Sequence, residues 1–569
     1  MGIRCKYNLL IMGLIFGLGN SSLMGQLQFP GSPMGDPSKL KAADVLYVLP
    51  PLDPLQIESD KQSSETSRLK SFHFARERLV DLTPESHGSW ETFEGHRIWR
   101  VHIISPGALS LGLVLNSYRL EEGVKLFVYN PDMTQVKGAF TSGNNKSSGV
   151  LPVGHLPGEE LIVEMQVPGE VNDYGEIRVE SVSHAFRSAG QSAGVAICPA
   201  GEFGCSQACM LDVNCEEGAD WQLTKRSVVR ILTNNTVYCT GVLVNNTAYD
   251  ETPYIVTAEH CITKQAYADR SVFQFNYESP DCFGTDGPLN MSISGAELIT
   301  VGDSIDFSLV KLSLTPPDSF DVYYAGWDRS DFQSTATSAI HHPWGDVKKI
   351  TSDFEVPSLT TKPSDVPYSG LEDYHYFSFW WIHRWDEGST QQGSSGGPLF
   401  NADQKLIGTL SGGVATCGDS IGYDYEKERI IYNQAFNYDD YYTRFSMAWD
   451  YNGESGPSLK PWLDPGNTGV MTLKGYEPIG LEPTTQLSKS HFTLFPNPVG
   501  DQLYVSAPDG LKPPISYRIY NLSGALVLEG ILYQKASNQI ETTLLKEGIY
   551  VVHLVSSPVQ EVHKIVVTR

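Results

Sequence analysis

The sequence is poor in basic residues and in long apolar segments. Its 569 residues include 41 Lys and Arg against 66 Asp and Glu, and the formal net charge is −25. Because phosphate backbones are bound by basic patches, this balance argues against nucleic acid as a partner, and it suits a soluble extracellular protein. No stretch is long and apolar enough for a comfortable transmembrane helix in the mature chain. No repeat of 20–50 residues is present, so a solenoid is not indicated.

The amino terminus has the pattern of a secretory signal. Arg4 and Lys6 precede a short apolar run over residues 9–18, and small residues follow. We therefore predict a signal peptide over residues 1–25, with cleavage before Gln26. A retained anchor is the alternative.

Removing the signal peptide leaves an even number of cysteines, which in an exported chain favours a disulfide framework. These are Cys198, Cys205, Cys209, Cys215, Cys239, Cys261, Cys282 and Cys417. A zinc site on Cys205, Cys209 and Cys215 is the competing interpretation. Their loose spacing, the lack of a nearby histidine and the predicted export all argue against it.

Three separated motifs carry the residues of a nucleophilic hydrolase. Ser395 lies in a tight run of glycines and serines that ends at Pro398, over residues 393–398, where the N–H groups of Gly393 and Ser395 can converge on an oxyanion. His260 follows a strand-like apolar stretch, and Asp306 stands at the head of another. The order His, Asp, Ser is that of chymotrypsin-like double β-barrel proteases. We expect Ser395 as nucleophile, His260 as general base and then acid, and Asp306 as its orienting carboxylate.

Further motifs over roughly residues 205–470 resemble bacterial lysyl endopeptidases of the trypsin-like superfamily. They lie at residues 209–215, 239–247, 325–329, 339–343 and 462–465. The resemblance implies a mainly β fold with a chymotrypsin-like double β-barrel. It also implies a secreted serine endopeptidase that cuts protein or peptide substrates after basic residues, lysine above all, with no cofactor and no metal. A catalytically idle, surface-displayed binding protein that keeps the fold is the alternative from another class.

The resemblance also suggests where a basic side chain would bind. Trypsin places its specificity aspartate six residues before the nucleophile, where this chain has Ser389. The lysyl endopeptidase pattern takes an aspartate from a later strand, and Asp440 matches it. A carboxylate at the pocket base would pair with a basic side chain. Asp439, Asp419 and Asp424 are nearby alternatives, and a solvent-facing acidic strand edge is a further interpretation of Asp439 and Asp440.

Other positions are assigned by the same pattern. Ser411, Gly412 and Gly413 match the segment that pairs with the substrate backbone. Ser411 stands where family members carry a histidine that partners a tryptophan. Ser394 replaces the aspartate of trypsin-type zymogens, so we expect activation by removal of a prosegment. For the tandem histidines His341 and His342, the family pattern favours a structural role over metal binding.

The family pattern implies three disulfides, Cys209–Cys417, Cys215–Cys282 and Cys239–Cys261. Cys198 and Cys205 are left over and are expected to pair with each other by elimination. The last of the three family pairs would hold the loop of His260 against its neighbouring strand.

The amino-terminal part of the mature chain is expected to be a β-rich propeptide over residues 26–194. Short alternating apolar runs at 98–104, 111–115 and 125–129 predict an antiparallel β-sandwich. A carbohydrate-binding module is the alternative. The linker over residues 186–200 offers Arg187 for cleavage, and the trypsin-like protease domain follows over residues 195–475.

After a linker at residues 476–490, residues 491–569 form a separate β unit. Its opening Pro-Asn-Pro, its Gly-Ile-Tyr and its terminal Lys with apolar residues resemble the β-sandwich sorting domain of the type IX secretion system. The resemblance implies that the secretion machinery is a partner. It also implies a secreted or cell-surface location after outer-membrane export. An ordinary small sandwich is the alternative.

Overall fold

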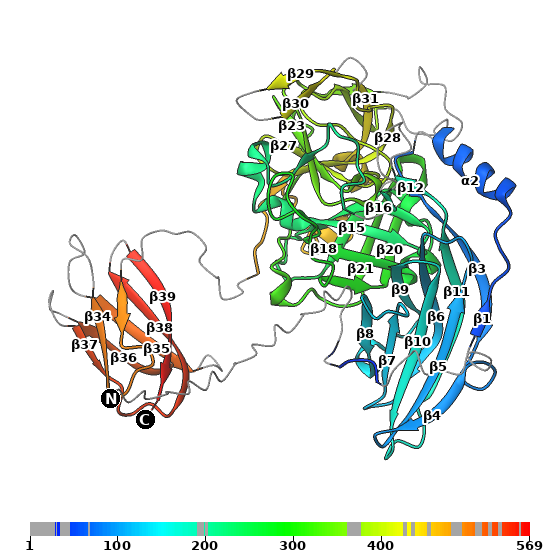
Figure 1. Cartoon of the computed structure of the whole chain (residues 1–569). Helices are drawn as coiled ribbons and strands as arrows, with labels where there is room; N and C mark the ends of the chain where they lie inside the picture. The colour runs from blue at the N-terminus through cyan, green and yellow to red at the C-terminus, as the bar shows by residue number, and fades with distance from the viewer. Residues whose placement is uncertain are drawn as a thin grey trace, which may run out of the picture. The chain divides into compact units, whose positions relative to one another are not determined.

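A computed structural model of the chain divides into two compact units, residues 1–480 and 481–569. The structure describes residues 29, 31–34, 46–66, 69–189, 198–199, 203–360, 377–424, 429–433, 438–451, 457–478, 492–506, 515–521, 526–532, 538–556 and 559–568. The predicted signal peptide and most of the linker at 476–490 lie outside these residues. The described parts are built mainly of strands, which confirms the predicted mainly β class (Figure 1). No helix among these described residues is long and apolar enough to cross a membrane.

The amino-terminal part of the first unit is a β-sandwich. One sheet has the order β1 (Leu46–Val48), β5 (His96–Ile104), β10 (Glu160–Pro168), β7 (Lys125–Tyr129) and β8 (Val136–Phe140), with β4 (Ser89–Phe93) paired to β5. The other has the order β3 (Ala75–Leu82), β11 (Gly175–Ala185), β6 (Ser110–Leu120) and β9 (Leu151–Pro157). Trp99, Leu113 and Met165 pack between the two sheets. The alternating apolar residues thus face a shared core. Helix α2 (Pro54–Thr66) lies between β1 and the short strand β2 (Phe72–His73) in the chain.

Two further sheets form the predicted protease region, in the two-sheet arrangement expected of a double β-barrel. The first has the order β19 (Ser292–Ser294), β18 (Ser271–Phe275), β15 (Val228–Thr233), β16 (Val237–Val244), β17 (Tyr254–Thr257), β21 (Phe307–Leu312) and β20 (Ala296–Gly302). Strand β2 adds to β16. A core of apolar residues that includes Ile231, Ile255 and Phe273 lies beneath it. Helix α3 (Gln265–Asp269) packs near β20.

The second sheet of the protease carries the later motifs. Its order is β14 (Leu211–Asp212), β24 (Lys349–Asp353), β23 (Thr337–His341), β27 (Pro398–Asn401), β28 (Leu406–Gly413), β31 (Tyr438–Arg444), β26 (Phe379–Arg384) and β25 (Ser358–Thr360), with β22 (Trp327–Asp328) and β32 (Thr472–Leu473) off this path. Helices α4 (Phe445–Trp449) and α5 (Lys460–Leu463) follow β31. Two short pairs, β12 (Ser188–Ala189) with β13 (Cys198–Pro199) and β29 (Ser420–Asp424) with β30 (Arg429–Tyr432), lie outside these sheets.

The sandwich docks against the first protease sheet through polar and aromatic contacts. The Arg270 guanidinium pairs with Glu77 at 2.7 Å and with Glu180 at 2.5 Å. The Asn235 side-chain amide donates to backbone carbonyls on β6 and β9. The rings of Phe74 and Tyr238 stack with centroids 4.6 Å apart. These contacts hold the sandwich, and the chain that follows β2, against the first sheet of the predicted protease region.

The second unit is a smaller sandwich. One sheet has the order β33 (Thr493–Phe495), β34 (Gln502–Ser506) and β37 (Asn538–Glu541). The other has the order β36 (Leu526–Leu532), β35 (Ile515–Asn521), β38 (Gly548–Ser556) and β39 (Val559–Val567). Leu503, Ile519 and Val552 lie in a core shared by both sheets. None of the three residues of the catalytic motifs belongs to this unit.

Candidate active site

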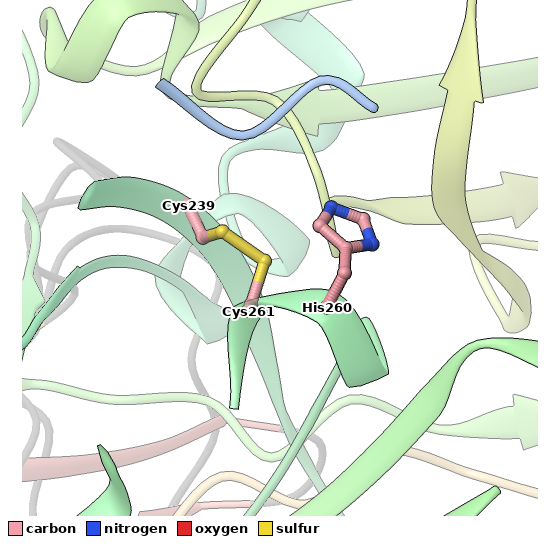
Figure 2. A group of neighbouring side chains, drawn as sticks. All are labelled: Cys239, His260 and Cys261. Atoms are coloured by element: carbon pink, nitrogen blue, oxygen red, sulfur yellow. A yellow bond between two sulfur atoms is a disulfide. The ribbon is translucent and has the colours of Figure 1, made fainter. Parts of the chain in front are cut away.

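A disulfide anchors the loop that carries His260. Cys239 on β16 is bonded to Cys261 in the short 3-10 helix η5 (Glu259–Cys261), with Cα atoms 6.2 Å apart. Figure 2 shows the imidazole of His260 beside this bond. The three side chains are close enough to one another to resemble a metal site. Both sulfurs are consumed in the disulfide, however, and a metal binds a thiolate. The cluster is therefore a covalent clamp on the histidine loop.

The other disulfides of the family pattern are also present. Cys209 is bonded to Cys417 and Cys215 to Cys282, with Cα separations of 5.7 Å and 4.4 Å. These bonds leave no thiolate at Cys209 or Cys215 for the zinc alternative. Cys205 is disulfide-bonded as well. The side chain of Cys198 is outside the described residues, so its pairing with Cys205 stays a prediction.

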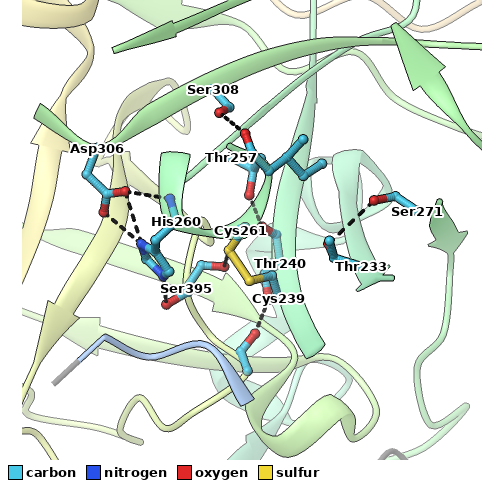
Figure 3. The surroundings of a disulfide bond; sticks show 12 residues. Thr233, Cys239, Thr240, Thr257, His260, Cys261, Ser271, Asp306, Ser308 and Ser395 are labelled. Atoms are coloured by element: carbon cyan, nitrogen blue, oxygen red, sulfur yellow. Dashed lines mark hydrogen bonds and ion pairs between the residues drawn. A yellow bond between two sulfur atoms is a disulfide. The ribbon is translucent and has the colours of Figure 1, made fainter. Parts of the chain in front are cut away.

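His260, Asp306 and Ser395 form one hydrogen-bonded series (Figure 3). His260 Nδ1 lies 3.0 Å from both carboxylate oxygens of Asp306, and His260 Nε2 lies 2.7 Å from Ser395 Oγ. Because a carboxylate accepts, Nδ1 carries the proton and the Nε2 lone pair faces the hydroxyl. The imidazole is thus oriented to take the proton of Ser395.

Asp306 is placed by its own backbone and by buried partners. It ends the 3-10 helix η6 (Asp303–Ile305) in the left-handed conformation, at φ 57°, and its side chain is fully buried. The backbone N–H of His260 also donates to its carboxylate at 3.0 Å. Behind it, Thr443 donates to the Ile305 carbonyl, and Ser411 lies 2.9 Å from Thr443. Ser411 therefore supports the loop of the carboxylate from β28.

The turn before β27 requires glycine on both sides of Ser395. Gly393 has φ +96°, and a Cβ there would lie 2.6 Å from the His342 carbonyl oxygen. Gly396 has φ +76°, and its Cβ would lie 2.1 Å from Thr257 Oγ1. Neither position has the backbone angle or the space for a side chain. Thr240, on the other sheet, fixes the position of this turn by two hydrogen bonds. Its backbone N–H donates to the Ser395 carbonyl at 2.8 Å, and its hydroxyl donates to the Gly393 carbonyl at 2.9 Å.

The tandem histidines His341 and His342 lie next to this turn. Nδ1 of His341 lies 2.7 Å from Ser394 Oγ, and Nδ1 of His342 donates to the Asp346 carbonyl at 2.9 Å. Burial lowers the pKa of His341 to about 3 and that of His342 well below its ordinary value. The two neutral rings form hydrogen bonds with different partners, as expected for residues with a structural role.

Of the four candidate pocket carboxylates, Asp440 is the one that is fully buried. Its Oδ2 accepts hydrogen bonds from Trp385 Nε1 at 2.7 Å and from Thr390 Oγ1. Asp439 is turned elsewhere and accepts from Trp381 Nε1. Gly413 on the paired strand would place a Cβ 2.0 Å from Asp440 Oδ1. A larger residue there would fill the space in front of the carboxylate.

Three residues of this neighbourhood have no signal in the local sequence. Trp385 and Thr390 hold Asp440, and Lys70, from before β2, places its ammonium 3.4 Å from Asp440 Oδ1. A close indole–imidazole contact is also present, since the ring centroids of Trp381 and His383 on β26 lie 3.8 Å apart with the planes tilted by 37°. Proximity in sequence could not reveal these contacts, because 55 residues separate Trp385 from Asp440.

Glu259, next to the catalytic histidine, has a raised pKa of about 7. Burial is the main cause, and the nearby Asp306 carboxylate adds to it. Its protonated form is therefore favoured in mildly acidic solution, which limits the negative charge around Asp306.

Two segments of the chain match known family models. Residues 203–427 match the family model described as lysyl endopeptidase, C-terminal domain, and residues 493–568 match the secretion system C-terminal sorting domain. The lysyl endopeptidase of Pseudomonas aeruginosa is 27% identical over 285 residues. That match covers 46% of this chain and 57% of the relative. The chain thus spans little more than half the length of this curated relative.

Solved proteases show a weaker overall likeness. A protease from M. tuberculosis in its active form is 13% identical with a TM-score of 0.25, and it covers 45% of this chain and 89% of its own. A Glu endopeptidase in complex with MPD is also 13% identical with a TM-score of 0.25, and it covers 42% of this chain and 92% of its own.

Proposed function

We propose that this chain, with its lysyl endopeptidase-type and sorting-domain segments, is a secreted serine endopeptidase that hydrolyses peptide bonds after lysine. The observation that carries the proposal is the hydrogen-bonded series from Asp306 through His260 to Ser395, with the buried Asp440 on β31, in the sheet whose strand β27 follows the Ser395 turn. No cofactor is needed for this chemistry.

The proposed reaction follows from the proton positions. Ser395 Oγ attacks the scissile carbonyl carbon while His260 Nε2 takes its proton, and Asp306 stabilises the resulting imidazolium. The N–H groups of Gly393 and Ser395 hold the oxyanion. His260 then protonates the leaving amine, and an acyl-enzyme on Ser395 remains. Water attacks this ester, with His260 again as base, and releases the new carboxylate.

Lysine selectivity is supported by the acceptors around the pocket carboxylate. An ammonium in front of Asp440 also meets the hydroxyl of Thr390 and the backbone carbonyl of Ala415, as the contacts of Lys70 illustrate. These acceptors suit a lysyl ammonium, because it is a compact charge with three N–H donors. A planar guanidinium instead needs a flat, two-pronged acceptor. The pocket is therefore expected to prefer lysine to arginine.

The second unit is proposed to direct export. Residues 493–568 match a family of sorting domains, and the unit folds around its own core. We therefore assign it to recognition by the secretion machinery, with the mature protein secreted or held at the cell surface. The triad lies entirely in the first unit.

A serine trap tests the enzymatic proposal against the idle binding protein. The mature protease region is treated with a fluorophosphonate, and the modified peptide is identified by mass spectrometry. Stoichiometric labelling of Ser395, lost in a His260→Ala variant that keeps its circular dichroism spectrum, is the expected result. A folded protein whose Ser395 stays unlabelled would contradict a catalytic role and favour the binding protein.

A further inference from the structure

The segment that joins α2 to β2, between the sandwich strands β1 and β3, runs through the candidate active site. Lys70 is buried, and its Nζ lies 2.7 Å from the Ala415 carbonyl oxygen, 3.0 Å from Thr390 Oγ1 and 3.4 Å from Asp440 Oδ1. Burial lowers the pKa of Lys70, and the Asp440 carboxylate opposes that shift. The ammonium thus occupies the space in front of the buried carboxylate.

The backbone of Lys70 is held where a scissile bond would lie. Its carbonyl oxygen accepts hydrogen bonds from the backbone N–H of Gly393 and, at 3.2 Å, from that of Ser395. These are the two donors expected to hold the oxyanion. A carbonyl that receives both has its carbon next to the Ser395 hydroxyl, which His260 is already oriented to deprotonate. The following peptide bond, Lys70–Ser71, is the one exposed to attack.

Both flanks of this bond are paired with the protease. Leu69 forms an antiparallel bridge with Gly412 on β28, in the segment predicted to bind substrate backbone. On the other side, β2 pairs antiparallel with Val237 and Tyr238 on β16. The segment is therefore extended across the site from one sheet of the protease to the other. This is how a protease holds a peptide substrate.

The same segment is tethered to the docked sandwich. The Phe74 carbonyl accepts from the backbone N–H groups of Phe186 and Arg187, which follow β11, while its own N–H donates to Thr236 in the turn between β15 and β16 at 3.1 Å. The guanidinium of Arg187 lies 5.2 Å from the ring centre of Phe72. The primed side is thus attached to the prosegment at several points, and the site is closed to other substrates while the segment stays in place.

We propose that Lys70–Ser71 is the first substrate of this protease, cut within its own precursor. The proposal rests on the proposed function and specifies the substrate of that site. Ser395 Oγ adds to the Lys70 carbonyl carbon, its proton passes to His260 Nε2 and then to the amine of Ser71. Water hydrolyses the resulting ester, so that the Lys70 carboxylate leaves and Ser395 regains its proton. Before this cut, residues 69–73 inhibit the enzyme by occupying its pocket.

The cut is expected to be intramolecular, because Lys70 is buried in its own pocket and a second molecule cannot reach it. The purified full-length precursor is incubated at concentrations that span 100-fold. The new amino terminus is then read by amine labelling and mass spectrometry. A terminus at Ser71, formed with one first-order rate constant at all concentrations, is the expected result. A rate that rises in proportion to concentration, or no Ser71 terminus from a precursor that becomes active, would overturn the proposal.

Two variants sharpen the test. Lys70→Gln abolishes the Ser71 terminus, whereas the matched control Lys61→Gln, on helix α2, leaves its rate unchanged. A Ser395→Ala precursor, which keeps Lys70, stays uncut at this bond when mixed with wild-type mature enzyme. Cleavage of that precursor at the wild-type rate would contradict an intramolecular cut even if Lys70→Gln fails to fold.

The outcome is separable from that of the proposed function. Mature enzyme that cuts external peptides after lysine, together with a precursor that gives no Ser71 terminus, would refute the internal substrate alone. Mature enzyme that cuts no lysyl bond would refute the function as well.

Discussion

Trp385 donates its indole N–H to Oδ2 of Asp440 over 2.7 Å, and both side chains are fully buried. This bond, with that from Thr390, holds one oxygen of the carboxylate and leaves Oδ1 facing the ammonium of Lys70. A buried carboxylate needs a cationic partner or several donors to remain charged. The proposed pocket thus presents a carboxylate that already pairs with a cation.

Replacing Asp440 with Asn is expected to remove the countercharge of the pocket. Leaving a lysyl ammonium buried without a partner should reduce kcat/KM for lysyl substrates by roughly 3–5 kcal/mol of transition-state binding. Substrates with a neutral residue at the cleaved position should change little. The measurement compares kcat/KM for matched peptides. Asp439→Asn is the control, since Asp439 bonds to Trp381 instead. An Asp440→Asn enzyme as fast as the parent on lysyl peptides would place the pocket acid elsewhere.

Thr390→Val is expected to weaken the discrimination between lysine and arginine. The substitution keeps the shape and removes a hydroxyl that contacts both Asp440 and the ammonium of Lys70. We expect a loss of about 1–3 kcal/mol in kcat/KM for lysyl peptides, and a smaller loss for arginyl ones. Competition between the two peptides in one tube gives the ratio directly. Thr416→Val, whose hydroxyl faces Gln207, is the matched control. An unchanged ratio would show that Thr390 does not select the ammonium.

The sequence predicts those parts of the site whose signals are local. His260 adjoins Cys261, Asp306 heads a strand, and Ser395 lies in a glycine-rich turn, so each motif can be recognised within a few residues. The structure then brings them together by pairing β17 with β21 and by seating the Ser395 turn on Thr240. Asp440 could be predicted only from the family pattern. Its local sequence, two adjacent acidic residues on a strand, looks the same when the strand is a solvent-facing edge.

Lys70 was not predicted, and the reason is physical. It lies in a polar segment that resembles a lead-in, and nearby sequence does not distinguish it from Lys61. Its partner Thr390 is 320 residues away in the chain. Such contacts depend on how the sandwich docks on the first protease sheet, which periodicity and spacing do not encode. The same holds for Trp385, whose role depends on the pairing of β26 with β31.

Acidification is expected to destabilise the docked sandwich through His155. Burial lowers the pKa of His155 to about 4, and its Nε2 donates to the Asn235 carbonyl of the protease at 2.7 Å. Since the folded pKa lies below the ordinary value near 6.5, the unfolded state binds more protons between these values. Stability should therefore be fully present above pH 6.5 and fall as the pH drops toward 4.

The thermal midpoint of the Ser395→Ala precursor, which cannot digest itself, measures this effect. His155→Gln should reduce the fall of the thermal midpoint between pH 6.5 and 4. The control His96→Gln should leave that fall unchanged, because the ring of His96, near the surface, is only hydrogen-bonded to the Glu94 carbonyl. Equal slopes in the parent and in His155→Gln would contradict the assignment.

Deletion of residues 491–569 is expected to stop export without impairing the protease. The second unit has its own core, and the sequence of that unit matches a sorting domain. The truncated chain should accumulate in the periplasm with its disulfides formed, because that compartment is oxidising. Fractionation of the native host measures its location. Normal yield in the medium or at the outer surface would refute the sorting role, and failure of the truncated chain to fold would show that the unit completes the protease.

The specificity of the mature enzyme tests the central claim most directly. The purified protease is incubated with a proteome-derived peptide library, and every new terminus is read by mass spectrometry, with Ser395→Ala as the blank. The series Asp306–His260–Ser395 and the acceptors around Asp440 predict cuts almost entirely after lysine. The rate of peptide hydrolysis by the Ser395→Ala blank should be lower by several orders of magnitude. Cuts that do not concentrate after lysine, or equal cutting by Ser395→Ala, would contradict the account.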